Sequence, residues 1–275
     1  MTSTRERQRA AARAKLAKEM AERASTARRK RQRQAVIGAG VALVLVVGGV
    51  IWLVTALGDD SSPTGTAADQ PAAALCQWNE VPADQRTPQT VDVGLPRTTA
   101  PPNTGTEVMT VDTSFGPVEV TMDRAKSPCS AEAFSYLASK KFWDGTKCHR
   151  MFPGMLQCGD PTAKGAGYRD TDGMGGPTFR YGNENLPTDE VPPYPEGVVA
   201  LANSGPDTNG SQFFFIYQDV QLSPDYTVLG KVTKGLDNIK KATAAGHNGK
   251  FDPSPGGGNP KSDIEIKSIT VKPGA

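Results

Sequence analysis

The sequence contains only two histidines, His149 and His247, and its four cysteines form no C-x-x-C pair. Zinc sites in proteins are built from closely spaced Cys and His ligands. The sequence therefore argues against a zinc site. A catalytic thiol is disfavoured as well: Cys148 adjoins His149, but neighbouring side chains on a strand point to opposite faces.

Apolar residues are also scarce, at 37% of the chain, whereas glycine (29) and proline (22) are abundant. A composition of this kind indicates many turns, or a folded domain with disordered additions.

Charge is unevenly distributed. Residues 1–34 hold 12 Lys or Arg and 3 Glu, a net charge of +9, and the other 241 residues carry −7. Such asymmetry indicates a tail with a separate role. We interpret 1–34 as a basic cytoplasmic tail that sets topology; contact with anionic lipid or nucleic acid is the alternative.

Charge is absent from residues 35–57, AVIGAGVALVLVVGGVIWLVTAL. About 20 apolar residues span a bilayer as a helix, so we predict a transmembrane helix at 35–57. Because the basic flank precedes it, the positive-inside rule predicts a single-pass type II protein of the cell membrane with its domain outside the cytoplasm. The rival interpretation is a cleaved signal peptide, for which ALG at 56–58 is a weak cleavage site.

Four cysteines, Cys76, Cys129, Cys148 and Cys158, follow the predicted span. In an exported domain an even number indicates disulfide bonds, and four cysteines allow three pairings, which the sequence leaves open.

Residues 58–105 are rich in Pro, Ala and Thr and show no periodicity, so we predict a linker. Cys76 and Trp78 suggest that one end of residues 75–105 docks on the following domain.

Residues 106–275 have the pattern of one folded domain. Strands are predicted at 107–113, 118–122, 146–152, 197–203, 212–218, 227–232 and 263–271, and helices at 127–141 and 235–245. Ser127 and Pro128 are typical of the cap and first position of a helix. Many short strands with two helices predict a mainly β, antiparallel barrel or sandwich covered by helices.

Three stretches occur in order: FWDGTKCHRMFPGMLQCGDP, VVALANSGPDTNGSQFFF and LSPDYTVLGKV. Together they resemble the cyclophilin family of peptidyl-prolyl cis-trans isomerases, most of all the membrane-anchored cyclophilins of actinobacteria. The resemblance covers about residues 107–272. It implies an eight-stranded antiparallel β-barrel capped by two helices, which agrees with the pattern of predicted elements.

The resemblance implies that Arg150, in the family's HR pair, is the catalytic residue. Rotation about an X-Pro bond breaks amide resonance, at a barrier of about 18–20 kcal/mol. An N–H donor aimed at the twisted amide nitrogen stabilises the transition state and not the planar ground state. This chemistry needs no metal and no cofactor, and we expect none.

The resemblance also implies a substrate-binding surface. Alternation on a strand places Gln212 and Phe214 on one face and Phe213 and Phe215 on the other. We expect Phe213 and Phe215 to lie in the core. We expect Phe214 to contact the substrate proline and Gln212 to hydrogen-bond with the substrate's peptide backbone. The remaining expected substrate contacts are Met155, Leu156, Gln157, Ala202, Asn203, Ser204, Leu222 and Tyr226.

The sequence departs from the family pattern after Arg150, where MFPGMLQCGD is one residue short and Met155 or Gly154 stands in place of a pocket Phe. We predict a monomeric isomerase that acts on proline-containing polypeptides outside the cytoplasm and binds no nucleic acid. The alternative is a cyclophilin-fold binding module or chaperone whose isomerase activity is incidental.

Overall fold

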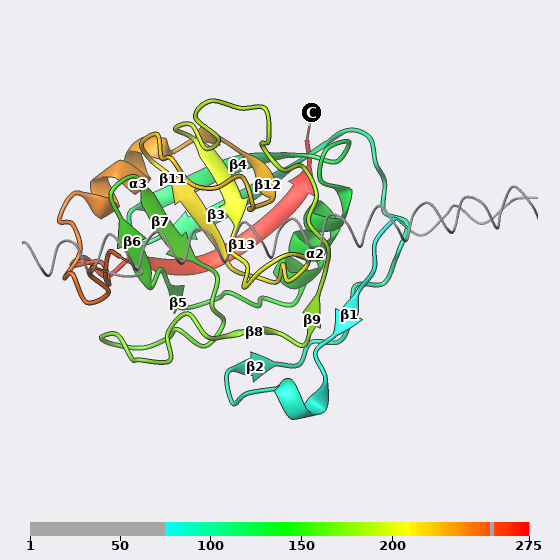
Figure 1. The fold of residues 1–275 in the computed structure, drawn as a ribbon, viewed down its shortest axis with the longest axis horizontal. Coiled ribbons are helices and arrows are strands. Elements are labelled where there is room, and N and C mark those ends of the chain that lie inside the picture. The colour runs from blue at the N-terminus through cyan, green and yellow to red at the C-terminus, as the bar shows by residue number, and fades with distance from the viewer. Residues whose placement is uncertain (1–74, 254–255, 275) are drawn as a thin grey trace, which may run out of the picture. The chain divides into compact units, whose positions relative to one another are not determined.

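Nine strands of the described chain form one antiparallel sheet, in the order β5-β13-β3-β4-β12-β10-β11-β7-β6 (Figure 1). The computed structural model describes residues 75–253 and 256–274. The strands are β3 (Thr106–Thr113), β4 (Gly116–Asp123), β5 (Thr146–Lys147), β6 (Arg150–Phe152), β7 (Met155–Cys158), β10 (Val198–Leu201), β11 (Phe213–Ile216), β12 (Val228–Lys234) and β13 (Glu265–Pro273).

The two end strands of this sheet, β5 and β6, are separated in the chain by only Cys148 and His149. The sheet must therefore curl until its two edges come close together. The sequence predicted a single strand over 146–152, but its two halves pair with β13 and β7, at opposite ends of the strand order. This division and the unpredicted β7 raise the seven strands predicted from the pattern to nine in this sheet, whereas the family resemblance implied eight.

The described residues form two α-helices, α2 (Pro128–Ser139) and α3 (Leu236–Thr243), which lie toward opposite ends of the sheet (Figure 1). Pro128 is at the start of α2 as predicted, but the Ser127 side chain does not cap it. Instead, the Glu184 carboxylate accepts hydrogen bonds from the backbone N–H groups of Cys129 (3.3 Å) and Ser130 (2.6 Å). A carboxylate at a helix N-terminus also complements the helix dipole. The predicted mainly β fold with two helices is confirmed.

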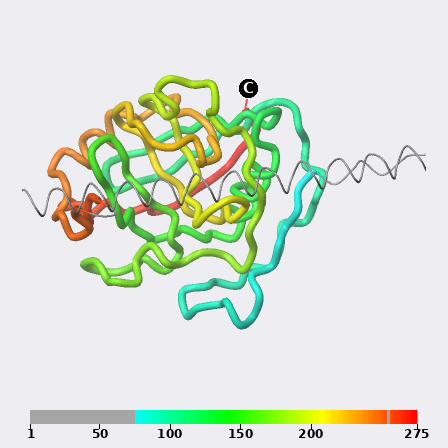
Figure 2. The backbone as a smooth tube through the Cα atoms, viewed as in Figure 1, coloured from blue at the N-terminus to red at the C-terminus, as the bar shows by residue number. Residues whose placement is uncertain are grey.

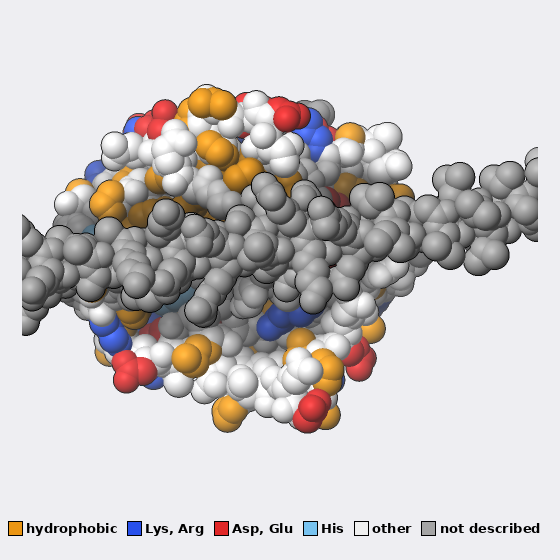
Figure 3. Space-filling model, in the orientation of Figure 1, with side chains coloured by type: hydrophobic (Ala, Val, Ile, Leu, Met, Phe, Trp, Pro, Cys, Tyr) orange, Lys and Arg blue, Asp and Glu red, His pale blue; other side chains and the backbone are white. Residues whose placement is uncertain are grey.

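The main core lies inside the curled sheet and under α2. Phe213 packs against Phe134 of α2 at 5.7 Å between ring centroids, and against Phe215 at 5.4 Å. Phe213 and Phe215 are fully buried in this cluster, as alternation along β11 predicts. The face shown in Figure 3 has acidic and basic side chains interspersed around its periphery, as is usual for a surface in contact with water.

Residues 75–105 pack against the domain and do not behave as a linker. In this segment β1 (Asn79–Glu80) pairs with β9 (Phe179–Arg180), and β2 (Thr90–Val91) pairs with β8 (Gly176–Pro177); a 3-10 turn, η1 (Ala83–Gln85), separates β1 from β2 (Figure 2). Trp78 stacks edge-on against Phe179 and Tyr181. The folded unit thus begins before Thr106, because two strand pairings and the partly buried Trp78 attach this stretch to the domain, which confirms the docking suggested by Cys76 and Trp78.

The cysteines form two disulfides, Cys76–Cys129 and Cys148–Cys158, which confirms the prediction of disulfide bonds. The first joins the 75–105 segment to α2, and the second joins the segment before β6 to the end of β7.

The predicted tail (1–34), transmembrane helix (35–57) and first part of the linker (58–74) lie outside the described residues. Among the described residues, no helix combines the length and the apolar character needed to cross a bilayer.

Candidate active site

Strands β6 and β7 form a hairpin that carries Arg150 and Gln157 opposite each other. Its turn contains Gly154, with φ of +88°, a conformation that residues with a side chain rarely adopt. A Cβ at this position would also lie 2.5 Å from Val220 Cγ1 and 2.8 Å from the Gln218 carbonyl oxygen. Glycine therefore allows the hairpin tip to pack closely against residues 218–220.

Three successive strand pairings place candidate side chains in one row across the sheet. Arg150 on β6 pairs with Gln157 on β7, Gln157 pairs with Phe214 on β11, and Phe214 pairs with Ala200 on β10. Directly paired residues project from the same face with Cβ atoms about 4.5–5.5 Å apart. The row brings together a cation, an amide and an aromatic ring on one surface.

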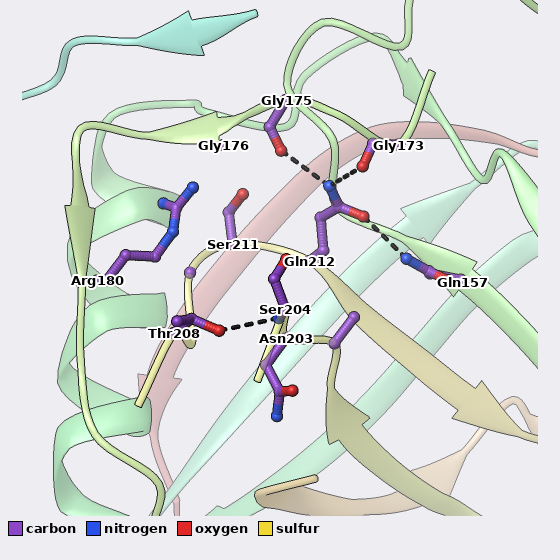
Figure 4. Close-up of a pocket in the computed structure, with 12 residues that line it drawn as sticks. Gln157, Gly173, Gly175, Gly176, Arg180, Asn203, Ser204, Thr208, Ser211 and Gln212 are labelled. Atoms are coloured by element: carbon purple, nitrogen blue, oxygen red, sulfur yellow. Dashed lines mark hydrogen bonds between the residues drawn. The ribbon is translucent and has the colours of Figure 1, made fainter. Parts of the chain in front are cut away.

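The two candidate glutamines are joined to each other and to a glycine-rich loop. Gln157 Nε2 donates to Gln212 Oε1 at 2.9 Å, and Gln212 Nε2 donates to the carbonyl oxygens of Gly173 and Gly175, each at 2.8 Å (Figure 4). These bonds fix the orientation of both amides.

Beside the glutamines is a polar cavity of about 120 Å³. Figure 4 shows Asn203, Ser204 and Thr208 on one side of it and Arg180 on another, with Thr208 Oγ1 accepting a bond from the Ser204 N–H at 2.8 Å. The residues that line the cavity are Gln157, Gly173, Gly175, Gly176, Arg180, Ala202, Asn203, Ser204, Thr208, Gly210, Ser211 and Gln212.

Arg150 is half-buried at the edge of the row. Its Nη2 donates to the Gly256 carbonyl at 3.2 Å, and its guanidinium lies 5.8 Å from the ring centroid of Phe152 and 6.0 Å from that of Phe251. Burial lowers the pKa of Arg150, while nearby Tyr226 acts in the opposite direction. An arginine starts from so high a pKa that it stays charged at neutral pH.

An apolar cluster separate from the main core flanks the row. It contains Met155, Tyr194, Val198, Ala200, Phe214, Ile216 and Val220, with Phe152, Ala202, Leu222, Tyr226 and Val228 packed against it. Phe214 is only 2% exposed, and the rings of Tyr226 and Tyr194 approach it edge-on at 5.5 Å and 6.2 Å. Met155 and Phe214 are thus on the predicted face, with Tyr226 beside Phe214.

Leu156 is not part of this surface. It is fully buried in the main core, inside the sheet. Met155 and Leu156 are neighbours on a strand and must point to opposite faces, so the expectation that both line a pocket is wrong for Leu156.

The turn after β10 holds the remaining candidates. Asn203 uses its side chain locally, since Nδ2 donates to the Asp225 carbonyl at 3.0 Å and Oδ1 accepts from the Gly205 N–H at 3.1 Å. It thereby joins the 203–205 turn to the segment that carries Leu222 and Tyr226.

Phe152, Phe251 and Arg180 belong to this surface, and Tyr194 lies fully buried beneath it; none of these was predicted. The Tyr194 hydroxyl donates to the Tyr226 carbonyl at 3.0 Å and accepts from the Tyr226 N–H at 2.9 Å, which anchors Tyr226 at the rim. Burial raises the pKa of Tyr194 to about 12, so the hydroxyl remains protonated. No local pattern around these residues marks them, because long-range folding brings them to the site.

His149 lies beneath the site and is 2% exposed. Burial lowers its pKa to about 4, although Asp160 and Asp172 oppose this shift. A neutral imidazole cannot serve as a second cation beside Arg150. Among the described residues, no group of three or more His, Cys, Asp or Glu side chains is placed to hold a metal ion.

Comparisons with known proteins agree with this geometry. Residues 108–271 match the family described as "Cyclophilin type peptidyl-prolyl cis-trans isomerase/CLD". The chain is 37% identical over 186 residues to "Probable peptidyl-prolyl cis-trans isomerase B" of Mycobacterium leprae, covering 62% of this chain and 59% of that protein. It is 36% identical over 214 residues to the protein of the same description from Mycobacterium tuberculosis strain H37Rv, covering 72% and 64%.

The matched region thus spans about three fifths of each mycobacterial relative. The human "Peptidyl-prolyl cis-trans isomerase-like 3" is 33% identical over 165 residues, covering 59% of this chain and 94% of that protein.

A cyclophilin-type isomerase structure from Cryptosporidium parvum superposes with a TM-score of 0.51 at 24% identity, over 62% of this chain and 99% of the other. A second structure of that protein, with an Ala-Pro dipeptide present, gives a TM-score of 0.50. These structures share the fold. Because the family match spans more than half of the chain, and because 94% of the human relative aligns at 33% identity, the chain belongs to the cyclophilin-type peptidyl-prolyl cis-trans isomerase family.

Proposed function

We propose that this protein catalyses cis-trans isomerisation of X-Pro peptide bonds, with Arg150 as the catalytic donor. The observation that carries the proposal is the cross-strand row of Arg150, Gln157 and Phe214, which puts a donor, a polar amide and an apolar ring on one surface. A peptide with a proline presents the complementary groups: an amide nitrogen, backbone polar groups and a pyrrolidine ring.

In the proposed mechanism, the apolar cluster around Phe214 and Met155 holds the proline ring. The fixed amides of Gln157 and Gln212 bond to the peptide backbone. The Arg150 guanidinium then donates to the prolyl nitrogen, which becomes pyramidal and basic only when the bond twists. Because that bond exists only near the transition state, it lowers the barrier rather than tightening ground-state binding. Cation-π attraction to Phe152 and Phe251, whose ring centroids lie 5.8 Å and 6.0 Å from the guanidinium, favours this position of Arg150.

The substrate class we propose is proline-containing polypeptides. The Cryptosporidium parvum protein was crystallised in the presence of the dipeptide Ala-Pro, which is the smallest X-Pro unit. The basic tail and the apolar stretch at 35–57 support a setting outside the cytoplasm, on a type II membrane anchor.

A second candidate is a binding module that holds proline-containing segments without relevant catalysis. The hydrogen bond from Arg150 Nη2 to the Gly256 carbonyl, of 3.2 Å, favours it, because it engages part of the guanidinium that catalysis would need.

The deciding experiment measures isomerisation of a proline tetrapeptide by purified full-length protein and by Arg150→Ala, together with the affinity of each for the peptide. Arg97→Ala, a change at an exposed arginine of the 75–105 segment, is the matched control. An isomerase loses turnover in Arg150→Ala but not in Arg97→Ala. If the wild type binds the peptide without speeding its isomerisation, the binding-module interpretation replaces the isomerase. If Arg150→Ala turns over peptide as the wild type does, Arg150 is not the catalytic donor.

A further inference from the structure

The strand that carries Arg150 is the least supported strand of the sheet around the site. β6 has three residues and is the last strand in the order, so only β7 pairs with it along its length. Its other edge is held by two backbone hydrogen bonds between Met151 and Gly258, of 2.8 and 2.9 Å. Short edge strands with few bonds open easily.

The Cys148–Cys158 disulfide closes the base of this hairpin. Cys148 precedes Arg150 by two positions, and Cys158 directly follows Gln157, so both candidate residues lie within the closed ring, next to its cross-linked ends. The two cysteines are at most 1% exposed and pack in the main core.

The same disulfide is at the seam of the curled sheet. Cys148 lies between β5 and β6, and its backbone N–H donates to the Ile264 carbonyl at 2.9 Å. Cys158 is the last residue of β7 and pairs directly with Phe213 of β11. The cross-link therefore joins the start of the edge strand to an interior part of the sheet.

We propose that the Cys148–Cys158 disulfide is a positioning element for the site, which holds Arg150 and Gln157 in register against Phe214. The inference rests on the proposed isomerase function. It is specific to this cross-link, since the second disulfide, Cys76–Cys129, joins the 75–105 segment to α2 and encloses a different part of the chain.

A role in stability alone predicts a different result. A disulfide stabilises a protein more when it closes a longer loop. The sequence separation is 53 for Cys76–Cys129 and 10 for Cys148–Cys158. If the cross-links only stabilise, loss of Cys76–Cys129 does at least as much damage as loss of Cys148–Cys158. If Cys148–Cys158 positions the site, its loss should lower the activity more than the loss of Cys76–Cys129 does.

The test compares Cys148→Ala/Cys158→Ala with the matched control Cys76→Ala/Cys129→Ala in full-length protein, at a temperature where circular dichroism shows each variant to be folded. Misplacement of a catalytic group by about 1 Å can cost on the order of 100-fold. We expect kcat/KM to fall by about 10- to 100-fold in the first variant, mainly through kcat, and to stay within about twofold of wild type in the control. Equal losses in both variants, or no loss in the first, overturn the proposal.

A double-mutant cycle shows whether the effect passes through Arg150. In the Arg150→Ala background, removal of Cys148–Cys158 should change kcat/KM by no more than about fivefold, because Arg150 is gone and only the contribution of Gln157 remains to be lost. An undiminished loss in that background contradicts the proposal. If the alanine pair does not fold, Cys148→Val/Cys158→Ala fills more of the core volume and takes its place.

Amide hydrogen exchange gives a readout that does not depend on catalysis. Loss of Cys148–Cys158 should speed exchange at Met151 and Gln157 while β3 and β4 keep their protection. Unchanged exchange in the hairpin overturns the inference whatever the activity. If the wild type has no isomerase activity, the proposed function fails, and the exchange result decides separately whether the disulfide holds the hairpin.

Discussion

Gln157 and Gln212 are 55 positions apart in the chain, yet their side chains share a hydrogen bond of 2.9 Å, from Nε2 of the first to Oε1 of the second. Gln212 in turn donates hydrogen bonds from its Nε2 to the carbonyl oxygens of Gly173 and Gly175, which hold its amide in place. The two amides therefore act as one unit on the floor of the site.

This coupling predicts the effect of removing either amide. Gln157→Ala and Gln212→Ala should each lower kcat/KM by about fivefold, the loss of one hydrogen bond worth about 1 kcal/mol. The double variant should lose much less than the product of the two single losses, because the residues are in one network. Steady-state kinetics on the three variants checks this, and fully multiplicative losses would show that the glutamines act independently.

Arg150→Ala should lower kcat/KM by about 10²–10³-fold, the usual cost of losing one preorganised donor at a transition state. Arg150→Lys should be nearly as harmful, since an ammonium on a flexible stem does not reproduce the planar fork of donors. Arg97→Ala should leave the rate unchanged. Near-normal activity in a folded Arg150→Ala protein contradicts the proposed mechanism.

The neighbouring phenylalanines Phe213 and Phe214 should respond differently. Phe213→Ala opens a cavity in the main core, where the ring contacts Phe134 and Phe215, and should cost about 3–5 kcal/mol of unfolding free energy. Phe214→Ala should cost about 3 kcal/mol, at the lower end of that range, because Tyr226 at the surface can move into the space. Chemical denaturation measures both.

Activity separates the two variants further. Under conditions where both are folded, Phe214→Ala should lose most of its kcat/KM, whereas Phe213→Ala should keep most of it. The opposite pattern would mean that the faces of β11 are assigned the wrong way round.

His149 should make the protein less stable in acid. Its folded pKa of about 4 is below the ordinary histidine value of 6.5, so between these values the unfolded chain binds a proton that the folded chain does not. Above pH 6.5 this difference in proton binding does not reduce the unfolding free energy. As the pH falls from 6.5 toward 4, it lowers the unfolding free energy by roughly 3 kcal/mol in total. His149→Gln should remove this slope from the dependence of unfolding free energy on pH.

His247→Gln is the matched control, because it removes the chain's other histidine from outside the site. It should leave the acid slope in place. If His149→Gln retains the wild-type slope, another group is responsible for it.

The proposed membrane anchor has its own test. Protease added to intact cells should remove the folded domain and leave a short membrane-bound fragment that contains residues 1–57, since the positive flank keeps the tail inside. Recovery of untethered protein with a new N-terminus near residue 58 would instead support the cleaved signal peptide.

The sequence by itself determined which residues share a face of each strand. Alternation along 212–216 separates Gln212 and Phe214 from Phe213 and Phe215, and the structure retains that division. The order of three motifs identified the family, and the pattern of short strands and two helices over 106–275 predicted a mainly β fold. These features are local, because strand geometry ties each side chain to its neighbours two positions away.

Only the tertiary structure decided how these faces meet. It divided 146–152 between two ends of one sheet, placed Leu156 inside and Met155 outside, and folded residues 75–105 onto the domain. It also brought Tyr194 and Arg180 to the site and chose the cysteine pairing among three possibilities. Pairing between distant segments depends on the free energy of the whole packed chain, in which many small contacts compete with conformational entropy, so no short stretch of sequence encodes it.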